Sequence, residues 1–236
     1  MIKEAIILAG GLGTRLRSVV PDLPKCMAPV NGKPFLGYVT RYFQKQGIEK
    51  FIFSLGYKSE VIAKFIRSEF SPGDCLFSIE DTPLGTGGAI RLACTKATGK
   101  NVLVINGDTL FTVDVNRLSM LHDEYDADCT LSLKPLPNID RYNGVELNGD
   151  NSVKDFKEPH PGSGLINGGV YVLNTPKYLD ENLPEKFSFE KEYLEKFYNS
   201  RRMYGFIQDT YFIDIGIPSD YHRAQTELKN TYAERS

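Results

Sequence analysis

The sequence predicts an α/β fold, an open sheet flanked by helices in which parallel strands come first and antiparallel strands follow. Short continuous apolar runs alternate with segments of helical periodicity in the first half of the chain. Such runs are typical of parallel strands that are buried on both faces. After about Asp128 the pattern changes to short alternating runs separated by turn-rich segments, which indicates antiparallel strands.

Each element follows from its own pattern. The apolar runs predict strands over Ala5–Ala9, Phe51–Leu55 and Val102–Ile105. Helical spacing predicts two helices between them, over 35–43, with Gly47 as its stop, and over 61–66. In the second half we expect strands over Cys129–Leu133, Gly144–Leu147, Val153–Phe156 and Gly168–Val172, then a helix over Phe189–Tyr198 and another after Pro218.

Composition excludes several classes of function. The chain has 236 residues and a formal net charge of −2, so no global field draws it to nucleic acid or to anionic lipid. The apolar stretches are strand-sized and no signal peptide pattern opens the chain, which indicates a soluble cytoplasmic protein without membrane partners. The 4 cysteines and 3 histidines are dispersed. They indicate ordinary thiols and give no support to a zinc site or a histidine triad.

A glycine-rich segment follows the first predicted strand. Gly11 and Gly13 start a dinucleotide fingerprint, but Leu16 stands where the third glycine is required. A P-loop is excluded as well, because the Gly-Lys pair at 32–33 is followed by proline. A tight turn after the strand is the alternative. The nearby Arg15 and Lys25 favour a loop whose backbone N–H groups and cationic neighbours hold a polyphosphate.

Six motifs along the chain together resemble those of one enzyme family. "LAGGLGTRL" followed by "PKCMAPVNGKP" resembles the signature of sugar-1-phosphate nucleotidyltransferases, and "PLGTGGAI", "INGD", "INGGVYVL" and "FIDIGIPSDY" follow in the family's order. The resemblance implies a Rossmann-like mixed, mainly parallel sheet flanked by helices, with a smaller sugar-binding lobe. We expect one domain over 1–236, with a nucleotide-binding lobe over 1–127 and a sugar-binding lobe over 128–236 that carries the second metal ligand.

The resemblance also implies roles for four catalytic residues. Asp108 and Asp214 occupy the positions of the family's two Mg²⁺ ligands, and two carboxylates with phosphate oxygens and water are a normal seat for that ion. Taken alone, the position of Asp108 would favour a helix N-cap or turn residue. Arg15 would hold the leaving phosphates, and Lys25 would neutralise charge near the α-phosphate. Positioning and charge neutralisation would therefore supply most of the acceleration.

Glu80 is the candidate reader of the base. It stands where family members that use uridine or thymidine nucleotides often carry glutamine, and a carboxylate, which only accepts hydrogen bonds, suits the N1–H and amine of guanine. A solvated glutamate at a strand end is the alternative. The glycines of "LGTGG" would let backbone approach base and ribose, or would form only a turn before a helix that starts near Ala89. The expected nucleotide-binding residues are Leu8, Gly10, Gly11, Gly13, Thr14, Glu80, Gly85, Gly87 and Gly88.

The sugar site departs from the family pattern. Asn143 interrupts the Arg-Tyr-Gly stretch, and Pro159 follows Glu158 where the family carries a phosphate-binding lysine. Lys157 is one replacement, although neighbouring strand residues face opposite sides. Another cation is the alternative. The expected sugar-binding residues are Gly144, Lys157, Glu158, Asn167 and Tyr171, of which Tyr171 could equally be a core residue.

The leading interpretation is an Mg²⁺-dependent enzyme that transfers a nucleoside monophosphate from an NTP, with GTP preferred, to a sugar 1-phosphate. The motif set is most similar to the heptose and mannose 1-phosphate guanylyltransferase branch of the family, which implies a manno-configured acceptor. Two alternatives stay open. One is the same chemistry with UTP or CTP, and the other is a catalytically silent NTP-binding regulatory subunit. Self-association into a homo-oligomer is also left open.

Overall fold

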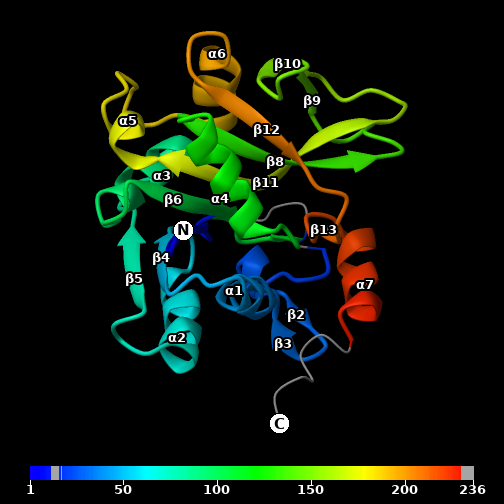
Figure 1. The fold of residues 1–236 in the computed structure, drawn as a ribbon. Helices are drawn as coiled ribbons and strands as arrows, with labels where there is room; N and C mark the ends of the chain where they lie inside the picture. The colour runs from blue at the N-terminus through cyan, green and yellow to red at the C-terminus, as the bar shows by residue number, and fades with distance from the viewer. Residues whose placement is uncertain (12–15, 17, 230–236) are drawn as a thin grey trace.

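A single large sheet organises the computed structural model, which describes residues 1–11, 16 and 18–229 (Figure 1). Within these ranges nine strands form the sheet, in the order β10-β9-β11-β6-β1-β4-β5, and β8 joins it by pairing with both β11 and β12. Strands from both halves of the chain therefore share one hydrogen-bonded surface. The division into lobes at 127/128 remains a prediction.

The first half supplies the parallel strands around β1, as predicted. Strand β1 lies between β4 and β6, with Ile6 beside Ile52 on one side and Val104 on the other. Strand β5 continues the parallel order beyond β4. The three predicted strands, β1, β4 and β6, are confirmed, each with bounds within one residue of those expected, whereas β5 was not predicted. The four strands are β1 (Glu4–Leu8), β4 (Lys50–Leu55), β5 (Cys75–Ile79) and β6 (Asn101–Asn106).

The helices of the first half begin and end where local chemistry allows. Helix α1 ends at Lys45, and Gly47 follows with a φ of +91°, a left-handed conformation that favours glycine and confirms the predicted stop. Helix α3 begins at Gly85, earlier than the start near Ala89 that the sequence indicated. The helices are α1 (Phe35–Lys45), α2 (Ser59–Glu69), α3 (Gly85–Cys94) and α4 (Val115–Glu124).

The second half supplies the antiparallel part, as predicted, except that β12 pairs parallel with β8. Strand β11 pairs antiparallel with β6 on one side and with β8 on the other. It is longer than the predicted strand, because the segment before Gly168 continues the pairing with β8 across a register shift. The strands are β8 (Cys129–Leu136), β9 (Gly144–Leu147), β10 (Val153–Lys157), β11 (Gly164–Asn174) and β12 (Met203–Ile207).

Two small ribbons stand apart from the large sheet. Strand β7 (Thr109–Phe111) pairs with β13 (Phe212–Asp214). Strand β2 (Pro29–Val30) pairs with β3 (Lys33–Pro34) after the short helix η2 (Lys25–Met27). The link between β2 and β3 is Asn31-Gly32, and both residues have positive φ, at 48° and 73°. Asn-Gly is the pair that favours such a two-residue hairpin turn.

The remaining helices lie in the second half of the chain. The predicted helix over 189–198 forms, with π-helical geometry in η3 (Phe189–Leu194) before α6 (Glu195–Phe197). Helix α7 (Pro218–Glu227) begins with its proline at the first position, where the missing N–H costs nothing. Helix α5 (Thr175–Leu179) connects β11 to the segment before η3.

The sheet buries one apolar cluster on each face. Ile7 belongs to the cluster that contains residues of α1, α2, α4 and α7, whereas its neighbour Ile6 belongs to the cluster that contains residues of α3, α5 and η3. Successive strand residues point to opposite faces, so helices on both sides explain the continuous apolar run in β1. The cysteines at 26, 75, 94 and 129 are free and buried, as the sequence indicated.

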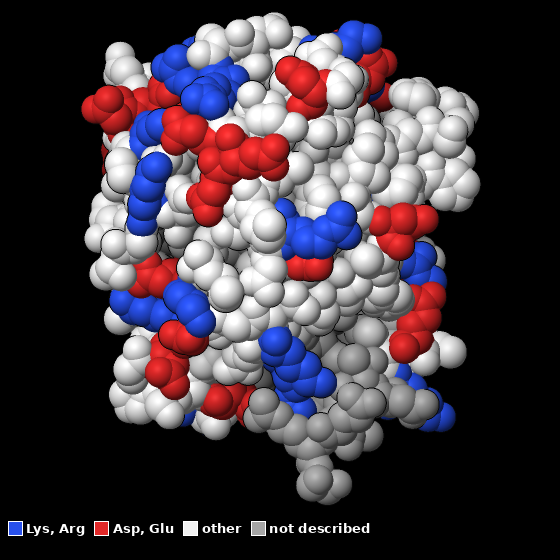
Figure 2. Space-filling view, in the orientation of Figure 1, with Lys and Arg blue, Asp and Glu red and all other residues white. Residues whose placement is uncertain are grey.

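The surface agrees with a net charge near zero. Lysine and arginine side chains are interspersed with aspartate and glutamate over the face in Figure 2, with no broad region of one sign. Within the described part of the chain, no helix has the length and apolar character needed to cross a bilayer.

Candidate active site

Two carboxylates from distant segments lie side by side at the β7–β13 ribbon. Asp108 sits between β6 and β7, and Asp214 is the last residue of β13. Asp214 pairs with Thr109 in the ribbon, and the backbone N–H of Ile215 donates to the carbonyl oxygen of Asp108 at 3.1 Å. Ladder pairing therefore fixes the two carboxylates next to each other.

A lysine occupies the space between them. Lys25 Nζ lies 2.6 Å from Oδ2 of Asp108 and 3.2 Å from Oδ1 of Asp214. Oδ1 of Asp214 also accepts the backbone N–H of Gly216 at 2.7 Å. The sequence predicted all three side chains as site residues, and their catalytic role stays a prediction. It did not predict that the ammonium would contact both carboxylates.

Hydrogen bonds between α7 and the β2–β3 hairpin connect the two parts of the chain that supply these groups. Tyr221 OH and Gln225 Nε2 both donate to the carbonyl oxygen of Pro29, at 2.7 and 2.8 Å. Gln225 Oε1 accepts the backbone N–H of Asn31 at 2.8 Å. The hairpin follows Lys25 and α7 follows Asp214, so these contacts stabilise the approach of the lysine to the aspartates.

Burial and charge act against each other in this cluster. Burial disfavours the charged form of Lys25, but attraction to Asp108 and Asp214 outweighs it and raises the lysine pKa. Burial and the negative charge of Asp108 raise the pKa of Asp214, and the contact with Lys25 offsets only part of that rise. Both directions follow from the burial of three charged groups that lie close together.

The donor set suits a magnesium ion. Two carboxylates already converge on one positive charge, the Lys25 ammonium, and oxygen ligands are those that Mg²⁺ prefers. No group of three or more His, Cys, Asp or Glu side chains that could hold a metal occurs among the residues the structure describes. Phosphate oxygens and water would have to complete the coordination, as they commonly do for Mg²⁺ at phosphoryl-transfer sites.

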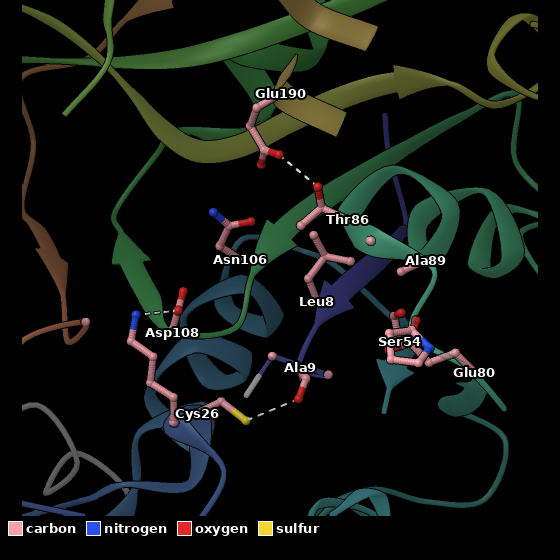
Figure 3. Close-up of a pocket in the computed structure, with 16 residues that line it drawn as sticks. Leu8, Ala9, Cys26, Ser54, Glu80, Thr86, Ala89, Asn106, Asp108 and Glu190 are labelled. Carbon is pink, nitrogen blue, oxygen red and sulfur yellow. Dashed lines mark hydrogen bonds and ion pairs between the residues drawn. The ribbon is translucent and has the colours of Figure 1, made fainter. Parts of the chain in front are cut away.

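A cavity of about 460 Å³ opens beside this cluster (Figure 3). Its wall combines the carboxyl ends of β1 and β6 with the start of α3, where ligands bind in open α/β sheets. Of the predicted site residues, those that line it are Leu8, Gly10, Gly11, Lys25, Glu80, Gly85 and Asp108. Gly13, Thr14 and Arg15 lie outside the described residues.

Glu80 lies at the cavity wall on the side of Ser54 (Figure 3). Its Oε2 accepts the backbone N–H of Leu84 at 3.0 Å, so the side chain also stabilises the turn that leads into α3. Oε1 lies against Gly10 and Gly56, and a Cβ atom at Gly56 would collide with it. Glu80 therefore has a structural role in the turn, and its contact with the base stays a prediction.

Gly87 and Gly88 do not line the cavity, and their assignment to the nucleotide stays a prediction. Both are buried against the segment 185–187. A Cβ at Gly87 would collide with the Phe187 ring and one at Gly88 with the carbonyl oxygen of Glu185. The N–H of Gly87 donates to the Phe187 carbonyl at 3.0 Å. Because Gly87 and Gly88 have no side chains, α3 packs closely on this segment. That packing stabilises a helix that begins at Gly85 instead of near Ala89.

Three predicted sugar-binding residues belong to strands of the sheet. Tyr171 is buried in the core with its ring 5.0 Å from that of Phe189, which fits the core interpretation. Its hydroxyl accepts from Asn167 Nδ2 at 2.8 Å across the register shift of β11. Gly144 is buried and pairs with Lys157 and Ile166. None of Tyr171, Asn167 and Gly144 lines the cavity.

The charged pair of the predicted sugar site lies at the edge of the sheet. Lys157 Nζ contacts Oδ2 of Asp155 at 2.6 Å and Oε1 of Glu146 at 3.7 Å. Glu158 follows β10 and is exposed. Neither residue lines the cavity. Whether Lys157 replaces the missing family lysine stays a prediction.

Several cavity residues were not predicted. Asn106 and Thr86 lie within quoted motifs, "INGD" and "PLGTGGAI", so the motif positions could have indicated them. Glu190 had no such signal. It lies about a hundred residues after Thr86, on η3, and reaches the cavity only because η3 packs on α3.

Known proteins match this chain along most of its length. The family model described as nucleotidyl transferase matches residues 4–231. D-glycero-α-D-manno-heptose 1-phosphate guanylyltransferase of Aneurinibacillus thermoaerophilus is 51% identical over 96% of this chain and 99% of its own length. The enzyme of the same name from Campylobacter jejuni is 44% identical over 93% and 97%.

A solved structure extends the similarity to the fold. The crystal structure of HddC from Yersinia pseudotuberculosis complexed with GMP-PN is 38% identical, with a TM-score of 0.86 over 96% of this chain and 100% of that one. The cavity at the strand ends, the Lys25–Asp108–Asp214 cluster and the full-length sequence match lead to one conclusion. This chain belongs to the nucleotidyl transferase family.

Proposed function

We propose that this enzyme transfers GMP from GTP to D-glycero-α-D-manno-heptose 1-phosphate, releasing pyrophosphate and forming the GDP-sugar. The observation that carries the proposal is the Lys25–Asp108–Asp214 cluster at the edge of a cavity large enough for a nucleotide. The choice of substrates is supported by the 51% identical relative, which carries this name and is matched over 99% of its length.

The chemistry is an in-line displacement. A phosphate oxygen of the sugar 1-phosphate forms a bond to the α-phosphorus, the bond between that phosphorus and the bridging oxygen breaks, and pyrophosphate leaves with the electron pair. The attacking oxygen is already ionised at neutral pH, so no general base is needed. Catalysis therefore rests on positioning and on neutralising charge at the α-phosphate.

The chain's own residues divide these tasks. The backbone of Gly10 and Gly11 lies at the cavity wall, where N–H groups can hold phosphate oxygens. Lys25, whose ammonium contacts both aspartates, would supply positive charge near the α-phosphate. Asp108 and Asp214 would hold Mg²⁺, which when bound neutralises phosphate charge. The sequence resemblance assigns Arg15 to the leaving phosphates.

The choice of guanine and the cytoplasmic location are proposed from two separate observations. Guanine is favoured because Glu80, an acceptor only, lines the cavity next to Gly10. A cytoplasmic location is favoured because the cysteines at 26, 75, 94 and 129 are free, as expected in a reducing compartment.

Pyrophosphate release with Mg²⁺, measured for four NTPs against a panel of sugar 1-phosphates, tests the proposal. We expect the highest kcat/KM for GTP with the heptose 1-phosphate. Release with UTP or CTP alone would contradict the assignment of guanine. No release with any pair would favour the silent NTP-binding subunit.

A further inference from the structure

We propose that Glu190 is a specificity-determining residue for the acceptor, with its carboxylate accepting a hydrogen bond from a hydroxyl group of the sugar. This inference rests on the proposed function. It assigns a sugar contact to a residue of η3, whereas the sequence motifs place the sugar site on β9 to β11.

Glu190 has the position that such a contact requires. It is the second residue of η3 and lines the cavity. Figure 3 shows its carboxylate directed into the cavity, with Thr86 and Leu8 between it and the wall that carries Ser54 and Glu80. Asp108 lies on another side of the same cavity. Glu190 therefore faces neither the proposed base site nor the reacting phosphates.

One oxygen of the carboxylate is anchored. Oε2 of Glu190 accepts from the hydroxyl groups of Thr86, at 2.8 Å, and Ser188, at 3.1 Å. The Thr86 hydroxyl in turn accepts the backbone N–H of Phe189 at 2.8 Å. These bonds join the start of α3 to the start of η3 and fix the orientation of the carboxylate.

The other oxygen is available to a ligand. Among the described residues, no hydrogen bond or ion pair engages Oε1 of Glu190. An ionised carboxylate accepts hydrogen bonds and donates none, so the partner it fits is a hydroxyl group rather than a phosphate. A carboxylate that is anchored on one side and open on the other is suited to select hydroxyl groups by position.

The surroundings of Glu190 place it on the sugar side. Its chain neighbour Phe189 packs its ring 5.0 Å from the ring of Tyr171, which brings this part of η3 against β11. Burial, with a smaller contribution from the negative charge of Glu190, raises the pKa of the Tyr171 hydroxyl. Tyr171 is bonded to Asn167, and both belong to the strand where the sugar site was expected. A hydroxyl group of the acceptor can therefore meet Glu190 while the nucleotide occupies the glycine side.

Three variants separate a sugar contact from a structural role. Glu190→Ala removes the acceptor, whereas Thr86→Val breaks the bond to Oε2 and keeps the acceptor. Glu192→Gln is the matched control, because Glu192 lies on the same helix turn, is exposed and caps Ser188 N–H at 2.6 Å. For Glu190→Ala we expect KM for the sugar 1-phosphate to rise by about 10- to 100-fold, with KM for GTP unchanged.

Thr86→Val should raise that KM by less, and Glu192→Gln should leave it unchanged. Equal effects of Glu190→Ala and Thr86→Val on KM, with equal losses of thermal stability, would assign Glu190 a bridging role only and overturn the proposal. So would a rise in KM for GTP alone, because it would assign the contact to the ribose.

Deoxy analogues of mannose 1-phosphate identify the hydroxyl group. If Glu190 accepts from one of them, the ratio of kcat/KM between the wild type and Glu190→Ala falls to about one for the analogue that lacks that group. A ratio that stays constant across the series would overturn the proposal. A wild type that releases no pyrophosphate with any acceptor would instead contradict the proposed function itself.

Discussion

Lys25 Nζ and Oδ2 of Asp108 lie 2.6 Å apart although 83 residues separate them in the sequence. The contact brings a cation from the N-terminal segment to a carboxylate at the end of a central strand. Asp214 completes the cluster from the C-terminal part of the chain. The active site therefore forms only when three distant segments are folded together.

Replacing Asp108 tests whether this cluster is catalytic. Asp108→Asn removes one of two carboxylates proposed to hold the metal and one partner of Lys25. We expect turnover to fall by about 100-fold or more, while the circular dichroism spectrum is unchanged. Asp209→Asn is the control, because Asp209 is exposed and contacts Lys134 outside the cavity. Turnover near the wild-type value for Asp108→Asn would rule out the assigned role.

The buried charge of Asp214 lowers the free energy of unfolding, and a neutral side chain at this position should raise it again. Its pKa is raised in the folded protein, so the folded state binds the proton more tightly than the unfolded state does. The resulting destabilisation is present above the folded pKa and is relieved as pH falls through it. We expect Asp214→Asn to be inactive but to unfold at a higher temperature at pH 7.

The gain for Asp214→Asn should shrink as pH is lowered into the range where the wild-type carboxyl is protonated. Thermal unfolding of both proteins between pH 3 and pH 8 provides the measurement. A variant that is less stable than the wild type at pH 7 would show that the contact with Lys25 outweighs the burial of Asp214.

Two glycine substitutions distinguish a binding role from a packing role. Gly11 has open space where a Cβ would lie, whereas a Cβ at Gly88 would collide with the Glu185 carbonyl oxygen. Gly88→Ala should therefore lower the free energy of unfolding by about 1–3 kcal/mol. Gly11→Ala should leave stability unchanged and raise KM for GTP by about tenfold. Denaturant titration and steady-state kinetics of the two variants measure these effects. A larger loss of stability for Gly11→Ala than for Gly88→Ala would contradict the two roles.

The buried imidazole of His122 should make the stability of the protein depend on pH, independently of the active site. It is buried with Nδ1 2.9 Å from the Thr130 hydroxyl, and burial lowers its pKa from 6.5 to about 4. The neutral form is favoured in the folded state, so stability is lost as pH falls from 6.5 toward 4, by about 3 kcal/mol in all. His122→Asn should flatten this slope, and His222→Asn should not. Parallel slopes in the wild type and His122→Asn would contradict the assignment.

The sequence predicted much of the first half of the fold because its signals are local. The apolar runs of β1, β4 and β6 and the periodicity of α1 and α2 depend on neighbouring residues, and all five elements formed. The start of α3 was misplaced because Gly85–Gly88 have low helix propensity. Packing against the segment 185–187 overrides that propensity, and no local pattern records it.

The same distinction applies to the site. Asp108, Asp214 and Lys25 were found because motif spacing marks each of them. Their mutual contacts depend on the β7–β13 ribbon and on hydrogen bonds between α7 and the hairpin, which span almost the whole chain. Glu190 was missed for that reason, since η3 meets α3 only in the folded protein.

Product analysis tests the central claim most directly. The wild type is incubated with GTP, the heptose 1-phosphate and Mg²⁺, and the products are identified by mass spectrometry. We predict GDP-heptose and pyrophosphate in equal amounts, and none from the double variant Asp108→Asn/Asp214→Asn. GTP consumption without GDP-heptose, or equal yields from the wild type and the double variant, would contradict the account.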